Sequence, residues 1–359
     1  MNDNFFLEKK ELTCTFINLI VVKMLFTYPR VMIQNSGNAA WIQMIYVTLI
    51  ALVIFLFIDY FYKWQDDLFD CAEKIGGKAL RVVIGLILTA VFTVNLANNM
   101  RIVPEIINTV LLPNMLTMSI LLLFMVTISI GAYMGIYAIC RINSLFMPIA
   151  AVVMFCFLLL LLPDINKNNL FPLVGLGTEK VFGTGIRSLS VFSDIMIIYI
   201  ILPKCKNRRD TKKSIIYSLI IGGIASTVIL LMYALIYPYP ISREFILPVY
   251  QMARIANIGA YFQRFEAFFE FVWSIVMLLY CSFYLYIICY CFSRTFKIKF
   301  YRELIIPFVI LAASIGFIPT SFIYFLSDGY FILRILTPIL YVIPAFLGIV
   351  YTLKERQMK

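Results

Sequence analysis

The chain has 359 residues, of which 62% are hydrophobic and only 14% are charged. A soluble protein of this length exposes far more charge, so the composition excludes the ordinary soluble classes and indicates an all-α polytopic membrane protein. The net charge of +11 does not indicate nucleic-acid binding, because the basic residues flank hydrophobic runs, where they set membrane topology.

Catalytic and metal-binding chemistry find little support in this composition. The sequence has no histidine, which removes histidine metal ligands and histidine-based catalysis. Its eight cysteines include no C-x-x-C pair, and most lie in apolar runs as small core residues do. We find no phosphate-binding glycine loop and no nucleophile–base pair. We therefore expect no enzymatic activity, no cofactor and no metal.

Hydrophobic runs of about 20 residues predict the membrane spans. We expect ten spans in a single membrane domain, at 11–34, 41–62, 81–103, 115–138, 142–163, 186–203, 213–237, 265–292, 301–325 and 331–353. With a cytoplasmic N-terminus, 20 basic residues then fall on the inner side and 9 on the outer side. Because ten is even, both termini are expected in the cytoplasm.

The first span is interrupted by a charge and a proline. Lys23 lies near the middle of the apolar run, and Pro29 follows six residues later. A charge at this depth costs roughly 2.5–3.5 kcal/mol and normally faces a cavity or a partner. Proline frees backbone carbonyls that only a protein-lined or watery cavity satisfies. We therefore predict a broken helix and a mid-membrane binding site that includes Val22, Lys23, Phe26 and Thr27.

A second interrupted segment opens the sixth span. Its small and polar residues loosen a helix and offer hydrogen bonds to a ligand. The candidates here are Gly183, Thr184, Gly185, Ser188, Ser190, Phe192 and Asp194. Residues 11–163 and 186–353 would then form two five-span halves in opposite orientation, a 5+5 inverted repeat. Paired broken helices in such halves mark a substrate site, where half-helix N-termini favour a carboxylate.

In this arrangement Asp194 lies at the same depth as Lys23. Either charge alone is costly there, so we predict an ion pair across the two broken helices. A zwitterionic ligand that competes for both charges would open the pair. The alternative for Lys23 is a side chain that snorkels to the membrane surface or loses its charge without touching a ligand.

Polar residues of other spans complete the candidate site. Asn95 and Asn98 in the third span lie about one turn apart and share a face, although hydrogen bonding between helices explains them slightly better than ligand contact does. Ser282 and Tyr286 share a face of the eighth span, where Tyr280, Tyr284 and Tyr290 are read as packing.

Two outer connections are longer than a loop requires. Residues 164–185 are turn-rich, and residues 238–264 contain a short amphipathic helix that is either an interfacial element or a lid. Glu266 and Glu270 follow it, and we expect them to pair as gate or structural charges with Arg264, Arg254 or Arg101.

The second connection carries the most specific family resemblance. The stretch PVYQMARIANIG at 248–259, followed by QRFEA at 263–267, resembles a signature of endospore germination permeases. These are the B-subunits of nutrient germinant receptors, a branch of the amino acid–polyamine–organocation superfamily. The stretches TYPR at 27–30 and NLFPL at 169–173 are similar to other conserved parts of that family.

The resemblance implies a ten-span, LeuT-like inverted-repeat fold in a receptor of the spore inner membrane. It implies a small nutrient such as an amino acid as ligand, and a receptor A-subunit and a lipoprotein C-subunit as partners. One departure is that Val22, Lys23 and Met24 stand where the family usually has glycines. Superfamily members that couple to Na⁺ use span-eight hydroxyls, which makes Ser282 a candidate ligand that a fixed charge at Lys23 disfavours. A secondary transporter of amino acids or other small solutes and a passive pore are the alternative functions.

Overall fold

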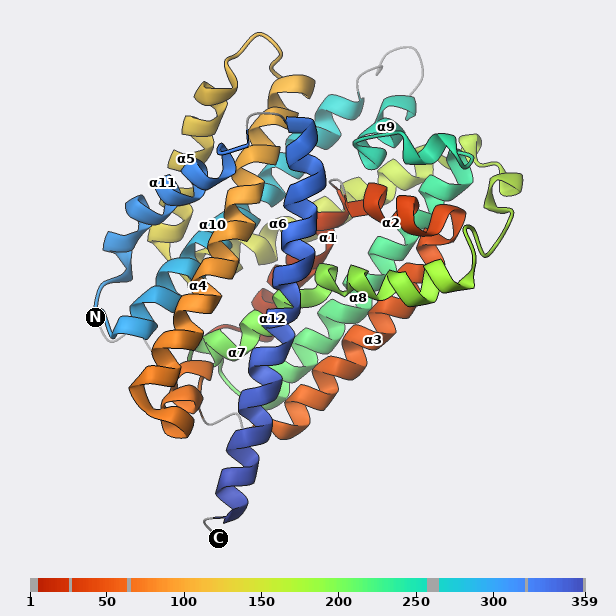
Figure 1. Ribbon diagram of the computed structural model, residues 1–359. Helices are drawn as coiled ribbons and strands as arrows, with labels where there is room; N and C mark the ends of the chain where they lie inside the picture. The colour runs from red at the N-terminus through yellow and green to blue at the C-terminus, as the bar shows by residue number, and fades with distance from the viewer. Residues whose placement is uncertain (1–5, 26–27, 63–65, 257–264, 320–321, 358–359) are drawn as a thin grey trace.

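The computed structural model is a bundle of helices and describes residues 6–25, 28–62, 66–256, 265–319 and 322–357 (Figure 1). In chain order the α-helices are α1 (Lys9–Met24), α2 (Tyr28–Ser36), α3 (Ala40–Phe61), α4 (Leu68–Val110), α5 (Thr117–Met134), α6 (Ile136–Leu160), α7 (Ile198–Ile201), α8 (Arg208–Ile236), α9 (Pro248–Ile255), α10 (Phe265–Phe296), α11 (Ile305–Gly316) and α12 (Phe322–Gln357). A π-helical turn, η4 (Glu179–Gly183), and a 3₁₀ helix, η5 (Thr184–Ile197), precede α7.

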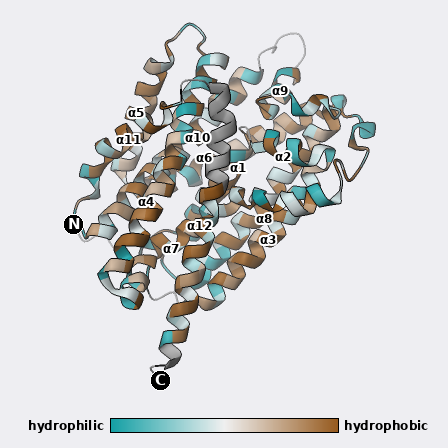
Figure 2. Cartoon of the chain, viewed as in Figure 1, coloured by the Kyte–Doolittle hydropathy of each residue, from teal (hydrophilic) through white to brown (hydrophobic). Residues whose placement is uncertain are grey.

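Eight segments of the described chain are long and apolar enough to cross a membrane, which makes this a multi-pass membrane protein. Hydrophobic residues dominate these long helices, whereas hydrophilic ones gather toward their ends and around α2 and α9 (Figure 2). The expected spans 11–34 and 301–325 are not among the eight. The helix of the first stops at Met24, and the second contains α11, which has only 12 residues.

Several predicted boundaries are wrong. The predicted loop before residue 142 is helical, because the chain turns earlier at Gly135, whose φ of 89° suits glycine, and α6 begins at Ile136. Helix α4 begins at Leu68, with Asp67 accepting from the backbone N–H of Asp70 as its cap, but its backbone is non-helical at Gly76 and Gly77. The long helix that follows this kink therefore starts within a few residues of the predicted residue 81.

The boundary between the last two spans also lies earlier than predicted. Helix α11 ends at Gly316 instead of residue 325, and α12 already begins at Phe322 instead of residue 331. The sequence does carry a signal here, because Pro319, Thr320 and Ser321 interrupt the apolar run directly before α12, and the prediction missed it.

Helix α1 is buried among α8, α6, α10 and η5. The hydroxyls of Ser214 and Ser218 on α8 donate to the carbonyls of Lys9 and Thr13, each at 3.0 Å. A methyl group at Gly222 would meet Ile20 at 3.0 Å, so glycine allows the two helices to approach closely. These contacts hold α1 in a fixed position where it presents Lys23 to η5.

Ion pairs join the helices at one end of the bundle. Lys212 of α8 lies 2.5 Å from Asp59 of α3, and Arg294 of α10 lies 2.6 Å from Asp67 before α4. These pairs tie α3 to α8 and α4 to α10 at the end where α1 begins.

The predicted helix in the second long connection is confirmed for Pro248–Ile255, which form α9. The rest of the signature, residues 257–264, lies outside the described residues. Helix α9 packs against α8 and α10.

Candidate functional site

Helix α1 of the first span ends one residue beyond Lys23. Helix α1 ends at Met24, Leu25 closes it, and α2 begins at Tyr28. Lys23 is therefore in the last turn of α1, where a cation is favourable at the negative end of the helix dipole. Phe26 and Thr27, both predicted site residues, lie outside the described residues.

The sequence predicts a loosened, interrupted helix at the start of the sixth span. The first half of this span consists of the continuous π and 3₁₀ segments η4 and η5, and α-helical geometry begins only at Ile198. Such geometry leaves backbone carbonyls with poorer partners than an α-helix does. The carbonyls of Ser190 and Val191 are used in this way by Lys23.

Lys23 and Asp194 form the predicted ion pair, with Nζ of Lys23 2.9 Å from Oδ2 of Asp194. The same ammonium group donates to the carbonyls of Ser190 at 3.2 Å and Val191 at 3.0 Å. Lys23 is 6% exposed and Asp194 0%. Three acceptors match the three N–H donors of the ammonium group, so the charge is both neutralised and fully hydrogen-bonded.

Two tyrosines of α10 extend this pair into a network. The hydroxyl of Tyr280 lies 3.5 Å from Oδ2 of Asp194 and 3.4 Å from Oδ1 of Asn95 on α4. The amide nitrogen of Asn95 donates to the hydroxyl of Tyr284 at 3.2 Å. The site therefore joins α1, η5, α4 and α10 through buried polar groups.

Some predicted side chains form no hydrogen bond with the pair among the described residues. Asn98 is buried one turn from Asn95, and its Oδ1 has no hydrogen-bond partner in the part of the chain that the structure describes. The hydroxyl of Ser190 is likewise buried and unpartnered among those residues. Phe192 and Val22 are buried in the apolar core.

The residues that open the sixth span lie apart from Lys23. Gly183 and Thr184 are exposed, and the Thr184 hydroxyl donates to the carbonyl of Lys180. Gly185 and Ser188 contact Gln43 of α3, whose amide donates to the Gly185 carbonyl at 3.2 Å and to the Ser188 hydroxyl at 2.6 Å. These bonds tie η5 to α3, a structural role that requires no ligand.

Ser282 and Tyr286 face away from the pair. The Ser282 hydroxyl donates to the carbonyl of Leu278, and its side chain occupies the space beside Gly131 of α5. Tyr286 packs against Tyr290 and Tyr301. The face of α10 that reaches the site belongs instead to Tyr280 and Tyr284, which we expected to be packing residues.

The gate pairing expected for the acidic residues of α10 is partly wrong. Arg101 lies 3.2 Å from Glu105 on its own helix and stacks over Phe317. Glu270 is 3% exposed and forms no ion pair within the described residues. Arg264 lies outside the described residues.

Residues 7–322 match the sequence profile of a family described as spore germination protein. The chain belongs to this family. The match covers the end of α1, the ion pair and all of α10, so the site described above lies within the family's shared region.

Two curated relatives, both from Bacillus subtilis (strain 168), carry spore germination names. Spore germination protein B2 is 18% identical over 278 residues, which cover 75% of this chain and 76% of the relative. Spore germination protein YndE is 24% identical over 283 residues, which cover 76% of this chain and 75% of the relative. Each relative therefore resembles this chain at low identity, over about three quarters of its own length and of this chain.

The fold is similar to that of a solved Na⁺-coupled sialic acid symporter in a substrate-bound, outward-open state. The TM-score is 0.66 at 10% sequence identity, over 94% of this chain and 80% of the symporter. At this identity the likeness shows a transporter-like fold and nothing about the ligand.

Proposed function

We propose that this germination protein is the membrane-embedded B-subunit of a spore nutrient receptor and that it binds a small zwitterionic nutrient between Lys23 and Asp194. The observation that carries the proposal is the buried ion pair at the junction of α1 and η5. The proposed architecture has ten spans in a 5+5 inverted repeat, at 11–163 and 186–353, with both termini in the cytoplasm.

A zwitterion suits this site because it can replace each charged partner by its own opposite charge. Its carboxylate would take the place of Asp194 beside Lys23, and its ammonium group would take the place of Lys23 beside Asp194. Neither protein charge is then left uncompensated in a low-dielectric interior, which would cost several kcal/mol. A ligand with only one charge would leave the other partner unpaired, so we expect selectivity for zwitterions such as amino acids.

Binding has to separate the closed pair, and this separation is a conformational signal. Lys23 ends α1 and Asp194 belongs to η5, so a ligand between them shifts one helix relative to the other. We propose that this shift passes to a receptor A-subunit and a lipoprotein C-subunit in the spore inner membrane.

The second candidate function is secondary transport of the same solutes, favoured by the transporter-like fold. A measurement of solute flux distinguishes a sensor from a transporter. Proteoliposomes that contain only this chain should bind labelled amino acid without accumulating it if the protein is a sensor. Accumulation that depends on Asp194 would instead assign it as a transporter.

The receptor role is tested in spores of the native organism. An Asp194→Asn replacement should abolish the response to one nutrient and leave responses through other receptors intact. The matched control is Glu244→Gln, since Glu244 is 72% exposed in an ion pair with Arg243. Unchanged germination of Asp194→Asn spores on every nutrient would contradict the proposal.

A further inference from the structure

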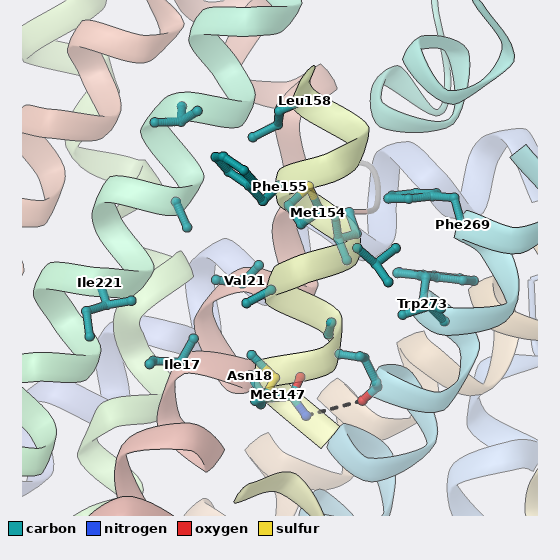
Figure 3. Close-up of a pocket in the computed structure, with 18 residues that line it drawn as sticks. Ile17, Asn18, Val21, Met147, Met154, Phe155, Leu158, Ile221, Phe269 and Trp273 are labelled. Atoms are coloured by element: carbon teal, nitrogen blue, oxygen red, sulfur yellow. Dashed lines mark hydrogen bonds between the residues drawn. The ribbon is translucent and has the colours of Figure 1, made fainter. Parts of the chain in front are cut away.

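An apolar cavity of about 280 Å³ lies between α1, α6, α8 and α10 (Figure 3). It is separate from the ion pair. Asn18, which lines the cavity, and Lys23 are five residues apart on α1, which places them about 140° apart around the helix. Of the residues that line the cavity, only Asn18 and Trp273 carry a nitrogen or oxygen atom in the side chain.

The amide of Asn18 is held in one orientation. Its nitrogen donates to Oδ1 of Asn143 at 2.7 Å and to the carbonyl of Val276 at 3.3 Å, and both of these atoms are acceptors. Its oxygen therefore faces the other way, up along α6 toward Met154 in Figure 3. Asn18 is 1% exposed, and this oxygen has no hydrogen-bond partner within the described residues. A buried acceptor without a donor is unfavourable, so a ligand that donates a hydrogen bond to this oxygen would be stabilised.

The cavity opens sideways between α6 and α8. Phe155 of α6 is 63% exposed and Ile221 of α8 is 48% exposed at this opening. Because both helices are long and apolar enough to span a membrane, the opening faces hydrocarbon and not water. The occupant therefore enters from the bilayer.

Size and charge narrow the class of occupant. An apolar cavity of roughly 150 Å³ holds one benzene molecule, so this cavity accepts on the order of ten carbon atoms. A two-chain lipid is too large. A charged headgroup would meet no opposite charge among the lining residues. A plain hydrocarbon would leave the oxygen of Asn18 unsatisfied.

We propose that this cavity is a second binding site, for an uncharged single-chain amphiphile dissolved in the bilayer. Its hydroxyl group donates to Oδ1 of Asn18, and its chain lies along α6 toward Leu158 and Phe269. The bound ligand contacts α1, α6 and α10 at the same time. This inference rests on the cavity and on Asn18, and it stands whether or not a nutrient binds at Lys23.

Trp273 lines the cavity and serves as the reporter. The protein has three tryptophans, so Trp41→Phe with Trp64→Phe leaves Trp273 as the single fluorophore. This variant in nanodiscs is titrated with 10-bromodecan-1-ol and, in parallel, with 1-bromodecane, since bromine quenches indole fluorescence on contact. We expect saturable quenching by the alcohol at a several-fold lower membrane concentration than by the hydrocarbon.

Two further variants control for folding and for quenching by the bilayer. Ala225→Leu on α8 fills the cavity without touching the hydrogen bonds of Asn18 and should remove saturable quenching by both probes. Ala90→Leu makes the same change at an exposed position of α4 outside the cavity and should leave quenching unchanged. Asn18→Leu should remove the preference for the alcohol. Equal affinity for the two probes in the parent protein, or saturable quenching that survives Ala225→Leu, would overturn the proposal.

Discussion

Lys23 and Asp194 are stabilised by each other and by two backbone carbonyls, so each depends on the other being present. Breaking a buried pair from one side leaves an uncompensated charge, whereas removing both charges together leaves an apolar contact. The hydroxyl of Tyr280 adds a further contact to Asp194. At the scale of single residues, the site is therefore a coupled unit and not a sum of independent contacts.

We expect Asp194→Asn to destabilise the purified protein by about 3–5 kcal/mol, because Lys23 then lacks its counter-charge. The double variant Lys23→Met with Asp194→Leu should recover much of this loss. The melting temperatures of the single and double variants, recorded in the same detergent, measure the loss and its recovery. If the single and double variants unfold at the same temperature, the two charges are not coupled.

At the scale of helices, close approach depends on a few glycines. A methyl group at Gly316 of α11 would meet the backbone carbonyl of Ala97 on α4, which cannot move aside as a flexible side chain can. At Gly348 of α12 the nearest atom, in the backbone of Phe61, would be 3.5 Å away, an ordinary contact distance. The two glycines therefore differ in what surrounds them.

From this difference we predict that Gly316→Ala destabilises the protein by about 1–3 kcal/mol, as overpacking does. Gly348→Ala should have no such effect. Melting temperatures of the two variants, measured side by side, make the comparison. Similar losses at both positions would show that α11 and α4 do not approach as described.

Asp67, which lies before α4 and pairs with Arg294 of α10, makes the stability of the protein depend on pH. Burial raises the pKa of Asp67 from its ordinary 3.8 to about 6, although Arg294 and the backbone N–H of Asp70 favour the carboxylate. The folded protein then holds this proton more tightly than the unfolded chain. Ionising Asp67 therefore lowers stability as the pH rises from about 4 to about 6.

Infrared difference spectroscopy should detect a carboxyl C=O band that titrates near pH 6 and is absent in Asp67→Asn. Arg294→Gln should move the titration to higher pH, because it removes a positive charge that favours the carboxylate. A titration near pH 4 in the unmodified protein would show that Asp67 is not desolvated.

For the whole molecule, the proposed topology places residues 241–243 and the C-terminal end of α12 on opposite sides of the membrane. A cysteine at Arg243, which is 51% exposed, should react with a membrane-impermeant maleimide added outside intact cells. A cysteine at Lys354, also exposed, should react only after the membrane is opened. Labelling of both positions from outside would contradict the three proposed spans between them.

The sequence predicts the membrane class, the end of the helix after Lys23, and Asp194 as the partner of Lys23. It does so because a charge inside an apolar span must face either a cavity or an opposite charge. It does not predict which face of α10 points inward. Tyr280 and Tyr284 lie on that face, yet aromatic residues on a hydrophobic helix suit packing and ligand contact equally. The available signal was the spacing of four residues between Tyr280 and Tyr284, which places two hydroxyl groups on one face of α10.

The most direct test of the central claim is ligand binding to the purified protein. Thermal unfolding is recorded with pooled and then single amino acids, since a ligand that binds only the folded state raises the melting temperature. We predict that at least one zwitterionic amino acid stabilises the unmodified protein and Glu244→Gln but not Asp194→Asn. Stabilisation of Asp194→Asn by the same amino acid would contradict the claim that the ligand binds between Lys23 and Asp194.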